Sequence, residues 1–440
     1  MSRPGLAALA GALLLALLLA GCGSEPSRPE PLVIMTPAQT INTISNPHIL
    51  DTTSFLKQAS AAFAKQYAGA PVQPEVKTFN HVDEIKAVTG SLGTAQAPDI
   101  LYGAFFNLIG YIDMGRAVPL DDLLDAALRA DLDPQALEAA SREGRVYLLP
   151  FMSTQNILIY NKELFRRCGL GHYIGEGREI QGWTLPQWRH ILDTLAAKLP
   201  HGIYPLALFA KNNEGDTHIL TYLRAFGGKI YDSEGNFDFQ APETVKALSW
   251  LQEGVRRHWF PPHPENLEMK DCAALFANGQ LAISLFNNSS PALASHLDEY
   301  GFVNYPGTVA TAFYIGFAVF DNGDPARVKA AKDFLAYLYA HDEWRDISAG
   351  NIPASRRSLA RYRDRIAMID EFERNAVIVV NFTNKSPNWQ GRSDSFRSVF
   401  WPNINKLLAL KITPEQCAAA LDRVCNAALE RGRKELRLHP

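Results

Sequence analysis

The sequence has few cysteines and no excess of charge of either sign. Its 440 residues include 5 Cys, and 43 Lys and Arg against 46 Asp and Glu give a formal net charge of −3. A chain of this length buries a large core without disulfides, so the sparse cysteines exclude a disulfide scaffold. The nearly neutral charge gives no general attraction to nucleic acid, and we expect no nucleic-acid partner.

The sequence also lacks the common catalytic and metal-binding motifs. G-x-S-x-G, H-E-x-x-H, G-x-x-x-x-G-K-[ST] and a complete G-x-G-x-x-G are all missing, and no two cysteines have C-x-x-C spacing. We therefore predict a protein that is not an enzyme and that uses neither a cofactor nor a metal ion. The paired carboxylates of a glycosidase have no sequence spacing of their own, so a surface glycoside hydrolase stays an alternative.

The cysteine spacing limits which disulfides can form. Cys417 and Cys425 lie eight residues apart in a helical pattern over 413–436. Eight helical residues span about 12 Å, which is too far for a disulfide. Nothing in the sequence decides whether Cys168 and Cys272 pair, and buried free thiols are the simpler interpretation.

A short apolar run opens the chain. Residues 6–20 contain only Leu, Ala and Gly, behind the single charge of Arg3. This run of 15 residues is shorter than the roughly 20 that a spanning helix needs, and its length is typical of a signal peptide. No later segment has 18 uninterrupted apolar residues, so we expect no membrane-spanning helix in the rest of the chain.

The run ends at a cysteine. Leu19-Ala20-Gly21-Cys22 followed by a polar, Pro-rich stretch resembles the lipobox of bacterial lipoproteins. The resemblance implies a lipoprotein signal peptide over residues 1–22, acyl chains on Cys22 and a flexible tether over residues 23–31. The alternative is a plain secretory signal in which Cys22 is incidental.

Strand and helix patterns alternate in the first third of the mature chain. Strands are predicted at Leu32–Met35, from Val76 and at Asp99–Tyr102, with helices between them, including Val82–Leu92. This alternation favours an α/β sheet with parallel strands. Ligands of such sheets lie beyond the carboxyl ends of the strands, so the loops after Met35 and Tyr102 are candidate ligand loops.

Further elements follow along the chain. Val146–Pro150 and Ile157–Tyr160 predict two separate strands, and Lys229–Phe239 predicts a hairpin around Asp232–Asn236. A further strand is predicted at Phe313–Phe320.

Several short phrases together resemble the sugar-binding group of the extracellular solute-binding proteins of ABC importers, a group that includes maltose-binding protein. They occur in the order of that family and cover nearly all of residues 31–440. The phrases are Gly115–Asp121, Gly144–Pro150, Leu158–Phe165, Gly182–Thr184 with Trp188, Leu275–Ile283, Ala330–Leu335, Ile352–Ser355 and Ser398–Trp401.

The resemblance implies an architecture. We expect the α/β, two-lobed periplasmic-binding-protein fold, in which a hinge of several crossings joins the lobes and the ligand cleft lies between them. Residues 31–150 plus 307–358 would form lobe one, and residues 151–306 plus 359–440 would form lobe two. Closure of the lobes over the ligand would create the form that the importer's membrane subunits recognise.

The resemblance and the strand-end rule also indicate ligand-binding residues. Aromatic rings cover the CH faces of a sugar, and amides bond its hydroxyl groups. The candidates are Gln39, Thr40, Phe106, Asn107, Asn287, Asn288, Trp389 and Trp401, of which Trp401 is expected to stack on the sugar. The alternatives are a core position for Trp401, a plain turn for Asn287-Asn288 and a surface anchor for Trp389.

These features predict a lipid-anchored, monomeric substrate-binding protein. It would sit at the bacterial cell envelope, on the periplasmic or extracellular side, held by the lipid on Cys22. Its ligand would be small, neutral and hydroxylated, a sugar or oligosaccharide, and its partners would be the permease subunits of an ABC importer. A ligand sensor for a signalling receptor is the other alternative, which the sequence does not separate from an importer component.

Overall fold

The structure, a computed structural model, describes residues 30–41, 43–69, 71–80, 83–211, 216–288, 297–307, 309–382 and 396–438. The predicted signal peptide with Cys22 and the predicted ligand residue Trp389 lie outside these ranges. Among the described residues, no helix is both long and apolar enough to cross a membrane.

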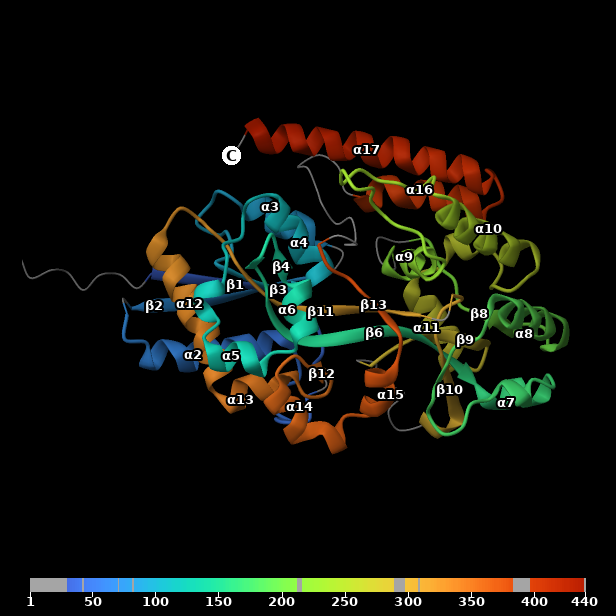
Figure 1. The fold of residues 1–440 in the computed structure, drawn as a ribbon, viewed down its shortest axis with the longest axis horizontal. Helices are drawn as coiled ribbons and strands as arrows, with labels where there is room; N and C mark the ends of the chain where they lie inside the picture. Colours follow the sequence, from blue (N-terminus) through green and yellow to red (C-terminus); the bar gives the residue numbers. More distant parts are fainter. Residues whose placement is uncertain are drawn as a thin grey trace, which may run out of the picture.

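One large sheet runs through the molecule (Figure 1). In the described ranges it has 11 strands, whose main path is β2-β1-β3-β11-β6-β10-β7. The bounds are β1 Glu30–Pro37, β2 Val72–Phe79, β3 Ile100–Ala104, β6 Leu149–Asn161, β7 Ile180–Gln181, β8 Tyr204–Leu206, β9 Leu281–Asn287, β10 Tyr300–Val303, β11 Ala310–Val319, β12 Ile352–Pro353 and β13 Val377–Val379. A small separate hairpin pairs β4 Ser141–Arg142 with β5 Arg145–Val146.

Helices cover the sheet at both ends of the molecule. Those at the β1–β2–β3 end are α2 Thr52–Gln66, α3 Glu84–Ser91, α4 Phe105–Asp113, α5 Ala126–Asp131, α6 Pro134–Ala139, α12 Pro325–Ala340, α13 Asp342–Arg345 and α14 Arg356–Tyr362. The remaining ones are α7 Lys162–Arg167, α8 Leu185–Lys198, α9 Asp216–Ala225, α10 Pro242–Arg256, α11 Met269–Ala277, α15 Ile369–Arg374, α16 Phe396–Leu408 and α17 Pro414–Leu438. Side-chain caps start several of them: Asp51 accepts from the backbone of α2, and Thr184 forms a capping box with α8.

The strand pairing agrees with the predicted parallel α/β start of the chain. β1 pairs in parallel with both β2 and β3. The prediction of two separate strands at Val146–Pro150 and Ile157–Tyr160 is wrong, because the 13-residue strand β6 contains both the end of the first stretch and all of the second, while Val146 belongs to β5. In Figure 1 this long strand passes from one half of the molecule to the other.

Apolar side chains form separate cores on the two sides of this crossing. One core takes its buried residues from 32–152 and 314–354. The second takes them from 158–305 and 396–429, and a third, smaller core packs on the sheet with residues between 157 and 310 together with Met368 and Phe372 of the α15 region. We call the half with the first core lobe one and the half with the other two lobe two.

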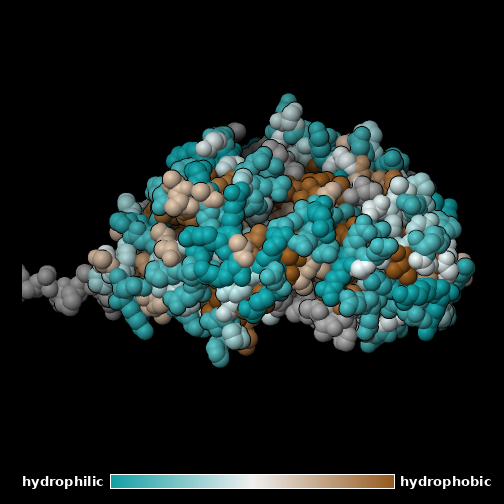
Figure 2. Space-filling view, turned by 60° about the horizontal axis from the view of Figure 1, so that its bottom comes forward, coloured by the Kyte–Doolittle hydropathy of each residue, from teal (hydrophilic) through white to brown (hydrophobic). Residues whose placement is uncertain are grey.

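Exposed large hydrophobic side chains are few in the part of the chain that the structure describes. Three large hydrophobic side chains, Leu50, Met269 and Leu410, are exposed in the described ranges. Figure 2 shows one face that is mainly hydrophilic, on which hydrophobic residues appear as separate brown areas. Scattered exposed apolar residues are ordinary for a folded chain, so they indicate no docking surface.

The described cysteines are all buried and free, so Cys168 and Cys272 do not pair. The predicted separation of Cys417 and Cys425 is confirmed, since both lie unpaired on α17. Burial raises the pKa of the Cys272 and Cys417 thiols to about 12, which keeps them in the unreactive thiol form.

Candidate functional site

Two strand ends from opposite lobes lie on either side of the crossing strand β6. β3 ends at Ala104, opposite Ile315 of β11, and Ile315 lies opposite Met152 of β6. β9 ends at Asn287, opposite Asn156 of β6. Met152 and Asn156 are separated by roughly 13 Å along the strand. The loops after β3 and β9 therefore both start beside the crossing between the lobes, where a ligand of an α/β fold is expected.

The lobe-one side of this junction carries the predicted pair Phe106 and Asn107, both half-buried at the start of α4. The Phe106 ring packs edge-on against Phe313 of β11, with centroids 4.9 Å apart. The Asn107 side chain donates a hydrogen bond of 2.6 Å to Glu84 at the start of α3. The start of α4 thus presents one ring and one amide next to the crossing, and the start of α3 supplies the carboxyl that the amide bonds.

Glu84 is a functional candidate that the sequence analysis missed. It is 2% exposed, and its Oε1 atom has no hydrogen-bond partner among the described residues. Burial raises the pKa of this carboxyl to about 7, although the Asn107 bond and the positive charge of Arg397 oppose the rise. An acid in the first turn of a predicted helix is common, so the sequence carried no signal of its burial.

Arg397 brings lobe two into the same site. It lies in the first turn of α16, whereas Glu84 belongs to lobe one, so their electrostatic interaction runs between the lobes. The charge of Glu84 also raises the pKa of the buried Tyr111, after the larger effect of burial. A carboxyl, an amide and a guanidinium are therefore gathered on the two sides of the junction.

The lobe-two side holds the predicted amides Asn287 and Asn288, both half-buried at the end of β9. Asn288 Oδ1 accepts from the backbone N–H of Gln155 at 2.9 Å, and its Nδ2 donates to the carbonyl of Ser153 at 3.1 Å. These two bonds tie the start of the following loop to β6. Asn288 is thus more than a turn residue, because its side chain bridges β9 to the crossing strand.

Trp401 lies on α16 and is 5% exposed. Its ring packs edge-on against Phe400 at 5.3 Å and belongs to the second core. The indole N–H has no hydrogen-bond partner among the described residues. In this structure the ring faces core neighbours, and its stacking on a ligand stays a prediction.

Gln39 and Thr40 lie on the loop after β1, as predicted, with Gln39 half-buried and Thr40 exposed. The backbone of Gln39 exchanges bonds with Thr52 at the start of α2, and Thr40 forms an isolated bridge with Asp51. The loop is therefore pinned to the helix that follows it. A role for either side chain in binding stays a prediction.

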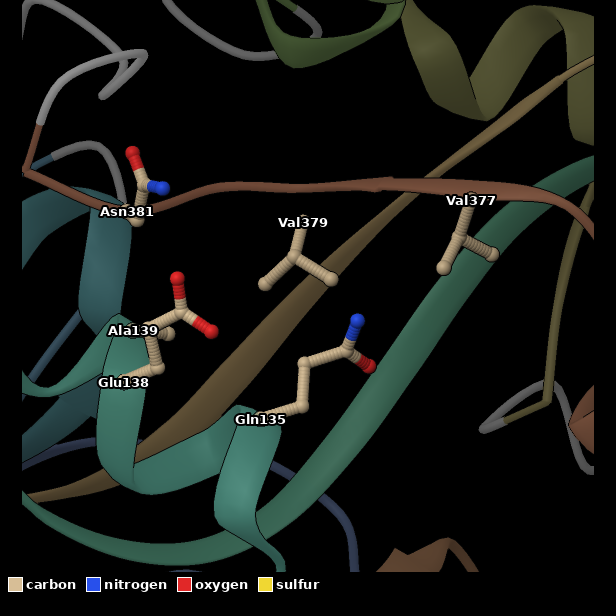
Figure 3. A pocket seen from close by; sticks show the side chains of 6 residues that line it. All are labelled: Gln135, Glu138, Ala139, Val377, Val379 and Asn381. Carbon is tan, nitrogen blue, oxygen red and sulfur yellow. The ribbon is translucent and has the colours of Figure 1, made fainter.

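Two cavities flank β13. The larger, of about 640 Å³, is lined by Ile378 of β13 and by residues of 224–238 from lobe two, including Arg224, Gly228 and Asp238. The smaller, of about 180 Å³, lies between β13 and α6 of lobe one. Figure 3 shows its walls: Gln135 and Glu138 rise from α6 toward Val377 and Val379. A volume of 640 Å³ is within the range of small-molecule sites.

The wall of the larger cavity is held by the far end of the chain. The predicted hairpin at Lys229–Phe239 appears as a turn with one isolated bridge, Tyr231 to Phe237. On α17, Asp422 accepts from the backbone N–H of Phe239 at 2.5 Å, and Asn426 bonds both the N–H and the carbonyl of Phe237. The turn therefore keeps its shape through side chains of the C-terminal helix.

The described part of the site offers polar groups suited to hydrogen bonding. Within the described ranges, no three His, Cys, Asp or Glu side chains are arranged to hold a metal ion. The polar groups at the junction are amides, one buried carboxyl and one guanidinium, which can bond hydroxyl groups of a ligand.

Comparison with known proteins identifies a family that matches this chain. Residues 46–343 match the family described as bacterial extracellular solute-binding protein. Among curated proteins, the chain is 29% identical to the mannitol-binding protein of Pseudomonas aeruginosa over 185 residues, which are 41% of this chain and 38% of that protein. A binding protein of Brucella abortus is 20% identical over 249 residues, 56% of this chain and 57% of that protein. The matched part thus spans less than two thirds of the length of these curated relatives.

Solved structures resemble the whole fold. The ABC substrate-binding protein Lmo0181 of Listeria monocytogenes, in complex with cycloalternan, has a TM-score of 0.68 at 17% identity, covering 92% of this chain and 100% of that one. A solute-binding protein of Agrobacterium radiobacter in complex with ribitol has a TM-score of 0.65 at 18% identity, covering 91% and 100%. These similarities confirm the predicted two-lobed α/β fold.

Proposed function

Because the chain belongs to the bacterial extracellular solute-binding protein family, we propose that it binds a sugar, oligosaccharide or polyol and delivers it to the permease subunits of an ABC importer. The observation that carries this proposal is the junction between two separately packed lobes. There β3 and β9 end on either side of β6, and the amides Asn107 and Asn288 follow these two strand ends. Such amides bond uncharged hydroxyl groups in both directions, as donors and as acceptors.

The named ligands of the relatives support this class of ligand. The Pseudomonas protein is named for mannitol, and the Listeria and Agrobacterium structures contain cycloalternan and ribitol. All three ligands are neutral and rich in hydroxyl groups. The larger cavity beside β13 has the volume for a small ligand of this kind.

Binding of this kind requires no chemical step. The family and the structural neighbours are binding proteins, so we propose a receptor without catalytic activity. Its site residues, Gln39, Thr40, Phe106, Asn107, Asn287, Asn288, Trp389 and Trp401, would contact the ligand when the lobes close. Closure in turn would be stabilised only by the differential contacts that the ligand makes in the closed form.

We also propose that the protein is a monomer anchored outside the cytoplasm by lipid on Cys22, with residues 23–31 as the tether. The order of an Arg, an apolar run, small residues and a Cys supports the anchor. β1 begins at Glu30, so the folded part starts at the end of this tether. We propose lobe borders at 150, 306 and 358, and the cores drawn from 32–152 and 314–354 on one side and from 158–305 and 396–429 on the other support this division.

A ligand panel tests the function. The purified full chain is titrated with hexoses, hexitols, pentitols and maltooligosaccharides, and binding is measured by calorimetry and by the shift of the melting temperature. A binder at 100 times its Kd stabilises the protein by about 2.7 kcal/mol. Asp422→Ala, which releases the turn 237–240 from α17, is expected to weaken binding if the larger cavity holds the ligand. Absence of binding across the whole panel would contradict the proposal, and turnover of a chromogenic glycoside would replace it with a hydrolase.

A further inference from the structure

Three side-chain amides meet where the chain passes between the lobes. Gln155 lies within β6, Asn304 lies just after β10 on the way to β11, and Asn375 lies just before β13. The Asn375 Nδ2 donates to Gln155 Oε1 at 3.1 Å and to Asn304 Oδ1 at 3.1 Å. The Asn304 Nδ2 donates back to Asn375 Oδ1 at 2.7 Å. We call these three residues the hinge amide cluster.

Two members of the hinge amide cluster are buried, Asn375 is half-buried, and the hydrogen bonds between them are specific. Gln155 is 7% exposed and Asn304 is 3% exposed. Asn375 uses both hydrogens of its amide, and Gln155 uses its own Nε2 to donate to the carbonyl of Phe372 at 2.8 Å. A buried polar network in which donors and acceptors match holds its members in one arrangement, because any shift leaves a buried group unsatisfied.

The cluster also connects to the ligand side of lobe two. The backbone N–H of Gln155 bonds Asn288 Oδ1, and Asn288 closes the contact through Ser153 on the same strand. A continuous path of hydrogen bonds therefore leads from the end of β9, through β6, to the segments that precede β11 and β13. All the side chains on this path are neutral amides, so the path carries no titratable group.

We propose that Gln155, Asn304 and Asn375 are positioning residues: they join the three crossings into one unit and hold Asn288 at the edge of the cleft. The crossings then bend together when the lobes open and close, and Asn288 keeps its place relative to lobe one. The claim that the cluster couples the crossings goes beyond the proposed function, and it is tested on the ligand-free protein. Its ligand part rests on the proposed function.

The test uses two variants of the full chain. Asn375→Asp keeps the side-chain size but replaces the donating amide by a carboxylate, which only accepts and which faces Gln155 Oε1. Gln155→Met keeps the chain length and removes the bonds to both Asn375 and Phe372. The matched control is Asn426→Asp, which breaks an amide contact to Phe237 that lies entirely within lobe two.

The hinge is measured in the ligand-free protein by small-angle X-ray scattering and by hydrogen exchange, and stability is measured by urea unfolding. We expect both hinge variants to enlarge the radius of gyration and to speed exchange in Val377–Val380 by about tenfold, the effect of one lost buried hydrogen bond. The control is expected to change neither quantity, even where it lowers stability as much. If the hinge variants lower stability like the control, with scattering and exchange unchanged, the cluster is merely structural and the proposal is overturned.

The ligand part has its own readout. If a sugar or polyol from the panel binds, the hinge variants are expected to weaken it about tenfold through faster dissociation, since a loosened hinge reopens more readily. Unchanged dissociation would overturn the role of the cluster in holding Asn288. If no ligand of the panel binds while scattering and exchange change as expected, the proposed function fails and the hinge inference stands. Should Asn375→Asp not fold, Gln155→Met decides the outcome.

Discussion

The two sides of the junction between the lobes hold their polar groups in different ways. On lobe one, Asn107 bonds a buried carboxyl, Glu84, whose pKa is raised to about 7. On lobe two, Asn288 bonds the backbone of β6 and, through it, a path of neutral amides. One side therefore responds to pH and the other does not, although both present an amide to the junction. Two similar amides are thus held by different kinds of partner, a titratable carboxyl on lobe one and neutral groups on lobe two.

The first prediction has the largest expected effect on stability and tests whether the separate cores of the two lobes unfold separately. Phe151 of lobe one stacks on Phe55, and Trp188 of lobe two packs edge-on against Trp183. Phe151→Ala and Trp188→Ala each remove a fully buried ring, and each is expected to lower the free energy of unfolding by about 3–5 kcal/mol.

Urea unfolding followed by tryptophan fluorescence distinguishes the two changes. Most of the described tryptophans lie in lobe two, whereas the lobe-one core contains Trp344. We expect Trp188→Ala to shift the fluorescence transition and Phe151→Ala to shift mainly the circular dichroism transition. Equal shifts in both probes for both variants would show that the lobes unfold as one unit.

The second prediction concerns the pH response of lobe one. The Glu84 carboxyl has a pKa of about 7 in the folded chain, against an ordinary value of 4.5. The folded state then binds the proton more tightly, so this group's contribution to stability is largest below pH 4.5 and is lost as the pH rises to 7. Glu84→Gln mimics the protonated form, and we expect it to exceed the parent by about 3 kcal/mol at pH 8 and to match it near pH 4.

Urea unfolding between pH 4 and 8 measures this difference. The control is Glu75→Gln on β2, an exposed carboxylate 3.6 Å from Lys77, which is expected to change stability by less than about 1 kcal/mol at any pH. A parallel pH profile for Glu84→Gln and the parent would refute the raised pKa.

A third prediction tests how the Asn107 amide affects the pKa of its partner Glu84. Asn107→Ala removes the hydrogen bond that favours the charged form of Glu84. We expect the pKa of Glu84 to rise further, and the pH profile of unfolding to move upward by about one unit. The same variant at fixed pH 5, where Glu84 is mostly protonated, should lose only about 1 kcal/mol. A downward shift would mean that Asn107 favours the neutral acid.

The smallest effect is expected on lobe two. Asn288→Ala leaves the pH profile of stability unchanged, because its partners are the backbone groups of Gln155 and Ser153. It is expected to weaken a ligand that binds in the panel by about 2–10-fold, the range for one hydrogen bond. Calorimetry at pH 6 and pH 8 checks both statements, and a pH-dependent loss would contradict the contrast between the two sides.

Much of the fold follows from local patterns in the sequence. The predicted strands Leu32–Met35 and Asp99–Tyr102 lie in or across β1 and β3, because buried parallel strands are short apolar runs between breakers. The helix expected at Val82–Leu92 is α3, Glu84–Ser91. The order of family phrases predicted the lobes, which no single periodicity could do.

The sequence predictions failed near the hinge, and the failures have a physical cause. Thr154, Gln155 and Asn156 interrupt an apolar pattern, so β6 looks like two strands. Gln155 is tolerated inside the strand because Asn375 bonds its side chain and Asn288 bonds its backbone N–H, whereas Thr154 Oγ1 has no hydrogen-bond partner among the described residues. Glu84 was missed for a related reason, since its burial depends on Asn107 and on packing between the lobes. Contacts over long sequence separations decide both cases, and local spacing carries no record of them.

The attachment of α17 to the turn at Phe237–Gln240 has a consequence for biosynthesis. Asp422 and Asn426 are nearly 190 residues away from the backbone groups that they bond. During synthesis the turn beside the larger cavity is therefore made long before the helix that supports it. A chain cut before Asp422 would still contain every residue of the lobe-one core but would lack these bonds, so we expect the turn beside the larger cavity to lose its support.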